Sequence, residues 1–340
     1  MFAVMEATRL ETLHLAHDPA TGLKAIIAIH STCLGPALGG CRYLAYPDQT
    51  SALRDAARLA QGMSYKAALA GLALGGGQAV LIRPPHVASR GALFEAFGRF
   101  VETLQGNYIT ATDSGTSSAD MDCVAQHTRY VTSTTRSADP SVQTALGLFA
   151  GLRATAKARL GSNDLQGLRV VIQGLGNVGY ALAEQLHAVG TELLVSDLDP
   201  GRVSLAVEQF GARGLDPEGI FAVPCDIFAP CGLGAVLNPA SIAQLRCCAV
   251  AGAANNQLAS PDMADELERR GILYAPDYVI NAGGLIQAAL THRGQDAVAV
   301  TAHLARIPQR LAELYGQAQA DKRSPARIAD ELAERLLYPD

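Results

Sequence analysis

The stretch 169–179 reads RVVIQGLGNVG, and it constrains the fold of this chain more than any other feature. A β-branched run leads directly into Gly174, Gly176 and Gly179, in the spacing G-x-G-x-x-G. The residues that follow, 177–189, show the period of an amphipathic helix. A strand, glycine turn and helix in this order present free N–H groups at the helix N-terminus, where they bind a pyrophosphate. The motif therefore predicts a parallel sheet with a dinucleotide site at this turn.

An acidic residue follows the motif at the expected distance. Asp197 ends a second predicted strand, 192–196, and 197 minus 174 is 23, close to the spacing of about 20 for the acid that binds the ribose hydroxyls. Its carboxylate would repel the 2′-phosphate of NADP, so the pattern favours NAD. Arg202 lies near enough in the sequence to weaken that preference.

Strand-like and helix-like segments alternate along most of the chain, which indicates an α/β fold with mainly parallel sheets. We expect strands at 24–30, 78–83, 108–111 and 129–132, and helices at 51–62, 90–104 and 144–160. The polar segment 133–140 predicts a boundary between a first domain, 1–136, and a Rossmann domain, 137–325. A terminal helix, 326–340, with Ile328, Leu332 and Leu336 on one face, is expected to return to the first domain.

Composition excludes several classes of protein. The net charge is −5 and no block of lysine and arginine occurs, so we expect no nucleic-acid partner and no binding to anionic lipid. The sequence shows neither a signal peptide nor a membrane-spanning stretch, which predicts a cytoplasmic protein. Its 7 cysteines form no C-x-x-C pair, so we expect reduced thiols and no metal site.

Two charged residues stand in places that are unusual for them. Lysine is scarce, yet Lys66 lies in an Ala, Leu and Gly stretch that would bury its ammonium unless an anion meets it there. A lysine that extends along the surface is the alternative. Asp113 follows a predicted strand, at the carboxyl end where open α/β sheets bind ligands. Taken alone, it would equally suit a helix N-cap.

Several blocks of the sequence resemble, in order, the leucine, phenylalanine and valine dehydrogenase branch of the glutamate dehydrogenase superfamily. The resemblance covers nearly the whole chain. The matching blocks are LGPALGGCR (34–42), GMSYKAALAGLALGGG (62–77), YITATDSGT (108–116), QGLGNVG (173–179), APCGLG (229–234), AGAANNQL (251–258) and APDYVINAGG (275–284).

The resemblance implies a substrate domain and a NAD domain that close over a cleft, and hydride transfer between an amino acid and the nicotinamide. Lys66 matches the family lysine that grips the substrate carboxylate, and Asp113 matches the aspartate that shuttles protons. Asn255 would line both the substrate and the nicotinamide. Products would be a 2-oxo acid and ammonia, and the chain would form a homodimer or a larger homo-oligomer through the first domain.

The resemblance also implies which residues form the two binding sites. Gly40 and Met63 would help form the substrate pocket, and the side chain of the substrate would meet Leu38, Met63, Leu285 and Ala288, none of which is charged. A glutamate side chain would find no cation there, so the predicted substrates are apolar. The implied cofactor residues are Gly174, Gly176, Asn177, Val178, Gly179, Asp197, Thr144, Asn255 and Asn281.

The chain departs from the family at one catalytic position. A second family lysine follows the first by twelve residues and polarises the reacting oxygen, but position 78 of this chain is Gln78. Two explanations fit: an introduced change from lysine, or a natural paralogue with altered or lost activity. The sequence therefore predicts an impaired dehydrogenase of leucine, valine or isoleucine type. The alternatives are a protein that binds NAD or an amino acid without turnover, and an aromatic amino-acid dehydrogenase.

Overall fold

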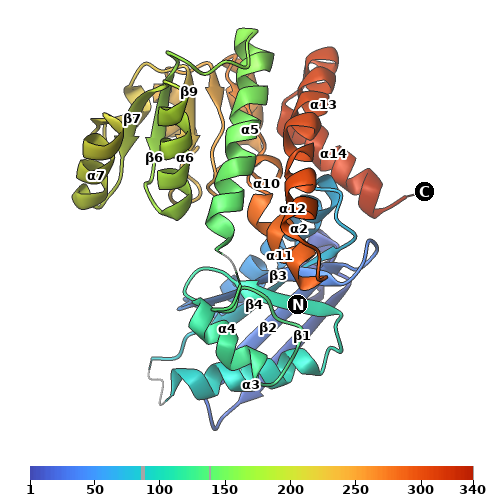
Figure 1. The fold of residues 1–340 in the computed structure, drawn as a ribbon. Helices are drawn as coiled ribbons and strands as arrows, with labels where there is room; N and C mark the ends of the chain where they lie inside the picture. Colours follow the sequence, from blue (N-terminus) through green and yellow to red (C-terminus); the bar gives the residue numbers. More distant parts are fainter. Residues whose placement is uncertain (86–88, 138, 340) are drawn as a thin grey trace. The chain divides into compact units, whose positions relative to one another are not determined.

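The computed structural model describes residues 1–85, 89–137 and 139–339, which form two compact units (Figure 1). The first unit comprises residues 1–139, 291–294 and 333–340, and the second comprises residues 140–290 and 295–332. The last helix, Pro325–Leu337, is therefore divided, because its residues from Ala333 onward belong to the first unit. Within the described ranges, no helix has the length and apolar character that crossing a bilayer requires.

The first unit is built on a five-stranded mixed sheet with the order β1-β2-β4-β3-β5. The pairs β1/β2 and β2/β4 are antiparallel, whereas β3 pairs in parallel with both β4 and β5. The strands are β1 (Thr12–Asp18), β2 (Leu23–Ser31), β3 (Ala37–Leu44), β4 (Gly75–Ile82) and β5 (Tyr108–Thr112), and the helices are α1 (Phe2–Thr8), α2 (Gln49–Leu69), α3 (Arg90–Glu102) and α4 (Ser118–Ala125).

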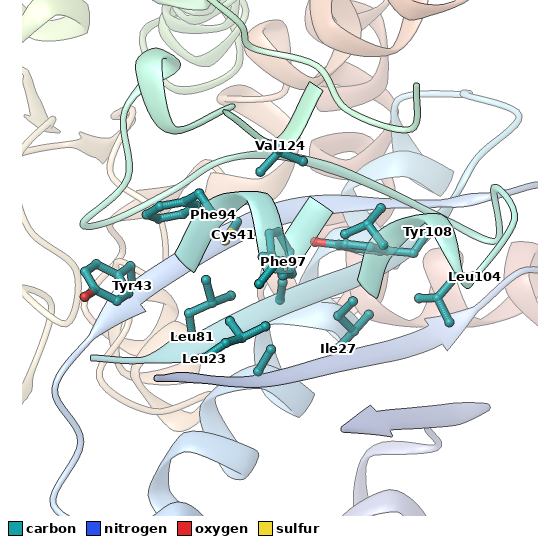
Figure 2. Close-up of a cluster of buried hydrophobic side chains, with 14 of the residues drawn as sticks. Leu23, Ile27, Cys41, Tyr43, Leu81, Phe94, Phe97, Leu104, Tyr108 and Val124 are labelled. Carbon is teal, nitrogen blue, oxygen red and sulfur yellow. The ribbon is translucent and has the colours of Figure 1, made fainter. Parts of the chain in front are cut away.

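Helices cover both faces of this sheet. Buried apolar residues of α3 and α4, such as Phe94, Phe97 and Val124, pack on one face against side chains that include Leu81 and Tyr108 (Figure 2). On the other face lies α2, whose buried residues are mainly alanines, at 52, 56, 57, 60, 67 and 68. Small side chains let a helix approach a sheet closely. The α2 face therefore has little volume to fill, and polar groups occupy part of it.

The second unit is a Rossmann domain with a six-stranded parallel sheet in the order β11-β10-β9-β6-β7-β8. Its first strand is central, and the chain crosses from β8 on one side to β9 on the other. Such a reversal of direction creates a switch point between β6 and β9, where open α/β sheets bind ligands. The strands are β6 (Arg169–Gln173), β7 (Glu192–Ser196), β8 (Arg213–Gly214), β9 (Ile227–Pro230), β10 (Ala249–Val250) and β11 (Leu273–Tyr274).

The helices of the second unit surround this sheet. A long helix, α5, leads into β6, and the glycine turn leads into α6. The α-helices are α5 (Pro140–Leu160), α6 (Asn177–Ala188), α7 (Pro200–Phe210), α8 (Pro239–Gln244), α9 (Asp262–Arg269), α10 (Asp277–Ile280), α11 (Gly283–His292), α12 (Ala297–Leu304), α13 (Arg306–Asp321) and α14 (Pro325–Leu337), and a 3-10 turn spans Ile220–Ala222.

The α/β fold with two sheets is confirmed, and several predicted elements need correction. The segment 129–132 is not a strand of the sheet, since it contributes a single isolated bridge, between Val131 and Thr110. The predicted helix 51–62 continues to Leu69, because a glycine at 62 is tolerated in a helix that packing already holds. The apolar face predicted for the last helix is correct at Ile328, which is fully buried, and wrong at Leu336, which is 37% exposed.

Candidate functional site

The first unit gathers polar side chains on the face of its sheet that α2 covers. Side chains alternate between the two faces of a strand. Cys41 and Tyr43 of β3 belong to the core on the opposite face, so Leu38, Gly40 and Arg42 lie on the α2 side. Parallel strands β3 and β5 end at the same edge, and Asp113 directly follows β5. The topology therefore brings Asp113 next to β3.

Gln78 of β4 connects these residues and is only 2% exposed. Its Nε2 donates a hydrogen bond to Oδ2 of Asp113 at 2.7 Å, and its Oε1 accepts one from the backbone N–H of Gly40 at 3.1 Å. Gly40 has no room for a side chain, since a Cβ there would lie 2.6 Å from Cβ of Asp113. The structure thus brings together three predicted site residues, Gln78, Gly40 and Asp113.

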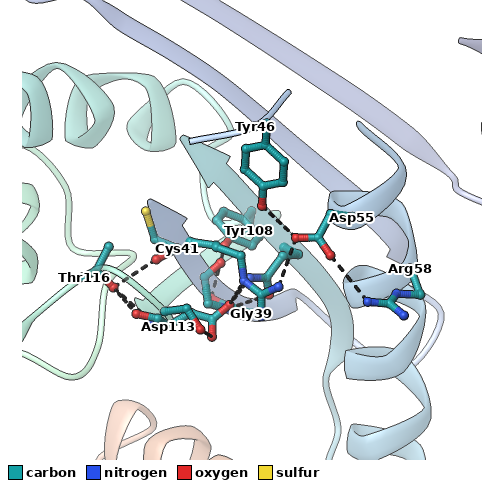
Figure 3. A network of polar contacts seen from close by, with 12 residues as sticks. Gly39, Cys41, Tyr46, Asp55, Arg58, Tyr108, Asp113 and Thr116 are labelled. Carbon is teal, nitrogen blue, oxygen red and sulfur yellow. Dashed lines mark hydrogen bonds and ion pairs between the residues drawn. The ribbon is translucent and has the colours of Figure 1, made fainter. Parts of the chain in front are cut away.

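Tyr108 completes the support of the same backbone from the opposite face. Its hydroxyl donates to the carbonyl oxygens of Gly39 at 3.1 Å and of Gly40 at 2.9 Å (Figure 3). The ring fills space next to Gly77, where a Cβ would approach it to 2.9 Å. Gly39 and Gly40 have no paired residues in β4. The side chains of Gln78 and Tyr108 form hydrogen bonds with their backbone groups instead. The sequence analysis did not identify Tyr108.

The loop that carries Asp113 is fixed by its own hydrogen bonds. Thr116 accepts from the N–H of Asp113 at 2.9 Å, and its hydroxyl lies 2.8 Å from the carbonyl of Asp113 and 2.9 Å from that of Cys41 (Figure 3). Gly115 adopts φ +83° and a Cβ there would meet the carbonyl oxygen of Tyr43 at 2.1 Å, so this turn requires glycine. Asp113 is held at a defined position and does not cap a helix.

Lys66 and Met63 lie in the second half of α2, and both are half-buried. Close packing of α2 on β4 places this part of the helix against the sheet, because a Cβ on Gly76 would approach the backbone N of Ser64 to 2.0 Å. The glycines that precede Gln78 thus serve to admit the helix. The assignment of Lys66 stays a prediction.

Arg42 and Asp55 belong to the same network, although the sequence analysis did not identify them. Arg42 donates through Nε to Oδ2 of Asp113 at 2.9 Å and through Nη1 to Oδ2 of Asp55 at 3.0 Å. Burial alone would lower the pKa of Arg42, but the two carboxylates raise it above its usual value, so the guanidinium stays charged. Arg42 is the last residue of the family block LGPALGGCR, and this position in the block is the sequence feature that could have identified it.

In the second unit, the glycine turn has the geometry that the motif predicts. Gly174 adopts φ +100°, and a Cβ there would lie 2.6 Å from the backbone N of Gly232, in the loop after β9. A Cβ on Gly179 would approach the carbonyl oxygen of Gly174 to 2.0 Å. At Gly176, by contrast, the nearest atom would be 4.0 Å away, in the side chain of Arg202. Space therefore remains at the switch point, beside the start of α6.

Asp197 lies at the end of β7 and faces this turn. Its Oδ2 accepts a hydrogen bond from the N–H of Leu175 at 2.6 Å, and its side chain is 12% exposed. Arg202 approaches the same oxygen to 4.0 Å, but it lies 3.6 Å from Asp199 as well and is 52% exposed. Asn177 and Val178 form the first turn of α6, whose N-cap, Gly176, provides no side-chain hydrogen bond.

Three further predicted residues are Asn255, Asn281 and Thr144. Asn255 lies in the loop after β10, Asn281 lies just before α11, and Thr144 lies in α5. Asn281 donates to Oδ1 of Asn255 at 2.8 Å and to the carbonyl of Ala253 at 3.0 Å. Its own Oδ1 is buried and has no hydrogen-bond partner among the described residues. Thr144 packs against the first turn of α11, where a Cβ on Gly284 would meet its hydroxyl at 2.9 Å. The amide pair and Thr144 are thus both held by the start of α11.

Leu285 and Ala288, the predicted contacts to the substrate side chain, are three residues apart on α11 and share a face of it. A cavity of about 910 Å³ lies elsewhere in the second unit, lined by residues of α5, α9 and α13. Arg159 in its wall hydrogen-bonds to carbonyls that precede β10 and β11, so this cavity is at the amino edge of the sheet. It is separate from the glycine turn, which is at the carboxyl edge.

Comparison with known proteins places this geometry in a family. The profile of the Glu/Leu/Phe/Val dehydrogenase dimerisation domain matches residues 10–130, and that of Glutamate/Leucine/Phenylalanine/Valine dehydrogenase matches residues 201–324. A leucine dehydrogenase from Geobacillus stearothermophilus is 46% identical, covering 99% of this chain and 93% of the relative. A phenylalanine dehydrogenase from Bacillus thermotolerans is 42% identical, covering 96% and 88%.

The fold agrees with these matches. The crystal structure of L-tryptophan dehydrogenase from Nostoc punctiforme superposes with a TM-score of 0.88 at 39% identity, covering 99% of this chain and 98% of that one. The predicted resemblance is thereby confirmed over nearly the full length. By sequence and by fold, the chain belongs to the glutamate/leucine/phenylalanine/valine dehydrogenase family of amino-acid dehydrogenases.

Proposed function

We propose that this chain oxidises an apolar L-amino acid to its 2-oxo acid and ammonia, with NAD as the hydride acceptor. The observation that carries the proposal is the carboxylate of Asp113, held at the end of β5 by Gln78 and Arg42 in a member of this family. A carboxylate fixed at the edge of a sheet is suited to accept and return protons.

The residues of the first unit would act on the amino acid in three ways. Lys66 would pair its ammonium with the substrate carboxylate and so fix the orientation of the α-carbon. Asp113 would take a proton from the substrate amino group and later activate the attacking water. Gln78 would donate a hydrogen bond to the developing oxyanion, but its neutral amide stabilises negative charge less than an ammonium does. Turnover is therefore expected to be slow.

The residues of the second unit fit a dinucleotide. The open space at Gly176 would leave room for a pyrophosphate at the start of α6, and the buried Oδ1 of Asn281 could accept from a carboxamide. Asp197 would hold the ribose hydroxyls and would repel a 2′-phosphate, which supports NAD over NADP. When bound, the nicotinamide supplies the hydride acceptor, and the residues of this chain orient the groups around it.

Changing Asp197 to Asn is expected to weaken NAD binding about tenfold. The amide keeps the size of the side chain but loses the charge that strengthens hydrogen bonds to the ribose, by about 1.5 kcal/mol or more. The same change removes repulsion and should strengthen NADP binding. Isothermal titration calorimetry with both dinucleotides measures the two effects. Asp199→Asn is the matched control, since Asp199 is 58% exposed and asparagine preserves its N-cap on α7.

The substrate proposed for this site is an aliphatic amino acid such as leucine, valine or isoleucine. The predicted contacts, Leu38, Met63, Leu285 and Ala288, carry no charge that would pair with a glutamate side chain. One methylene in an apolar pocket is worth about 1 to 3 kcal/mol, so differences among the aliphatic substrates should be modest. An aromatic substrate is the alternative, because Ala288 is small and relatives named for phenylalanine and tryptophan are similar to this chain.

A panel of amino acids tests the proposal. NADH formation is measured by absorbance with leucine, valine, isoleucine, phenylalanine, tryptophan and glutamate, for the chain as it stands and for Gln78→Lys. We expect the highest kcat/KM with an aliphatic substrate and no measurable rate with glutamate. A glutamate-dependent rate would contradict the assignment of the pocket, and a preference for phenylalanine or tryptophan would support the aromatic alternative.

A second candidate function is ligand binding without turnover, and Gln78 itself favours it. Both ends of the Gln78 amide are hydrogen-bonded, and its Oε1 satisfies the N–H of Gly40, which a lysine has no acceptor to do. If this function is correct, the protein binds NAD and leucine, and Gln78→Lys does not increase the rate of NADH formation.

For assembly, the dimerisation-domain profile over residues 10–130 supports a homo-oligomer built on the first unit.

A further inference from the structure

Arg42 is held between two carboxylates by the fork of its guanidinium. Nε points to Asp113 and Nη1 points to Asp55, at 2.9 and 3.0 Å, and the side chain is 16% exposed. Asp55 is fixed in turn by Tyr46, whose hydroxyl donates to the same Oδ2 at 2.7 Å (Figure 3). A planar guanidinium with two anchored N–H groups has little rotational freedom. Its direction toward Asp113 is therefore preset.

The two oxygens of Asp113 are consequently not equivalent. Oδ2 accepts from both Arg42 and Gln78, at 2.9 and 2.7 Å. Oδ1 receives the hydroxyl of Ser114 at 3.4 Å, a long and weak contact, and no shorter one within the described ranges. An oxygen with two strong donors has little capacity left for a proton. Oδ1 is the oxygen available for proton exchange.

Other titratable groups facing Asp113 do not offset its charge. Burial raises the pKa of the Cys41 thiol and of the Tyr108 hydroxyl, and burial together with the Asp55 hydrogen bond raises that of Tyr46, so all three stay neutral near pH 7. Gln78 is neutral as well. Arg42 is the cation in direct contact with the carboxylate, while α2 carries the further charged groups Arg54, Asp55, Arg58 and Lys66.

We infer that Arg42 is a positioning residue for Asp113, which, with Asp55 as its second anchor, holds Oδ2 in place and leaves Oδ1 to exchange the proton. The inference rests on the proposed function, since the proton exchange is that of amino-acid oxidation. It assigns a role to a residue that does not touch the substrate.

Three variants in the Gln78→Lys background test this inference, because that background is expected to turn over fast enough for kcat and KM to be measured separately. Arg42→Met keeps the apolar stem and removes every donor. Arg42→Lys keeps the charge, but one ammonium cannot repeat the two diverging N–H contacts. Arg58→Met is the matched control, since Arg58 lies 3.6 Å from Asp55, is 61% exposed and has no contact with Asp113 in the structure.

We expect Arg42→Met to lower kcat about 10- to 100-fold, with KM changed less than about threefold, because misplacing a proton-transferring group affects the chemical step. Arg42→Lys should recover part of kcat, and Arg58→Met should match its parent. A folded Arg42→Met enzyme with the kcat and KM of Arg58→Met would overturn the inference.

A failure of the proposed function can be distinguished from a failure of the inference about Arg42. If Gln78→Lys with Arg42 intact oxidises no amino acid, the proposed function is wrong. Crystal structures of Arg42→Met and Arg58→Met then decide the role of Arg42. Rotation of the Asp113 carboxylate in the first variant alone would support positioning, and an unchanged carboxylate in both would exclude it.

Discussion

Gln78→Lys is expected to raise leucine-dependent NADH formation by about 10²- to 10³-fold over the chain as it stands. The substitution places an ammonium where the amide now donates to Asp113, and one preorganised electrostatic group contributes about this factor to the chemical step. Because the gain belongs to the transition state, kcat should rise more than KM falls. Steady-state kinetics with leucine and NAD measure both parameters.

The same substitution should cost stability. Lysine has no acceptor, so the N–H of Gly40 loses the Oε1 that it now contacts at 3.1 Å. A buried N–H without a partner costs about 1 to 3 kcal/mol, and thermal unfolding should show the loss. Gln78→Met, which lacks both charge and donor, is the matched control. If Gln78→Lys is no faster than Gln78→Met while NAD and leucine still bind, binding without turnover becomes the better description.

Asp113→Asn in the Gln78→Lys background is expected to lower kcat by about 10²- to 10⁴-fold. The amide has nearly the same shape and its oxygen can still accept from Arg42 at the present 2.9 Å position, but it cannot take up a proton. The loss therefore reports the acid–base role and not a disrupted fold. Single-turnover kinetics with saturating leucine separate the chemical step from binding.

The control for this variant is Asp48→Asn in the same background. Asp48 accepts from the N–H of Ser51 at the start of α2, and asparagine serves equally well as an N-cap. Its kcat and melting temperature should match those of the parent. An Asp113→Asn enzyme that retains more than a tenth of the parental kcat would show that another group, not Asp113, moves the proton.

Local sequence determined the second unit well because its site depends on short-range geometry. Gly174 needs a positive φ and Gly179 needs the absence of a side chain, and both requirements are met within one turn. Asp197 follows one strand later, at the carboxyl edge that parallel topology dictates. Motif spacing therefore carries most of the information, and the resemblance to the family added the individual residues that surround the turn.

The first unit was less accessible to sequence reasoning. Blocks of family sequence indicated Lys66, Asp113 and the departure at Gln78, but periodicity missed β3 and ended α2 too early. Glycine-rich strands give little hydrophobic alternation, and a helix whose buried stripe is alanine has a weak amphipathic signal. The same glycines and alanines that weaken the hydrophobic pattern also shape the candidate site, since small residues leave room for polar side chains between sheet and helix.

The sequence by itself determined the α/β class and the glycine turn with its acid, and it indicated Asp113 as the candidate carboxylate. Only the tertiary structure decided what surrounds that carboxylate. Arg42 and Asp113 are 71 residues apart in the chain, and Gln78 and Gly40 are 38 apart. Strand order and register bring them within hydrogen-bond distance. A local pattern cannot specify which donor reaches which oxygen, because that choice depends on side chains from β3, from β4 and from the loop after β5.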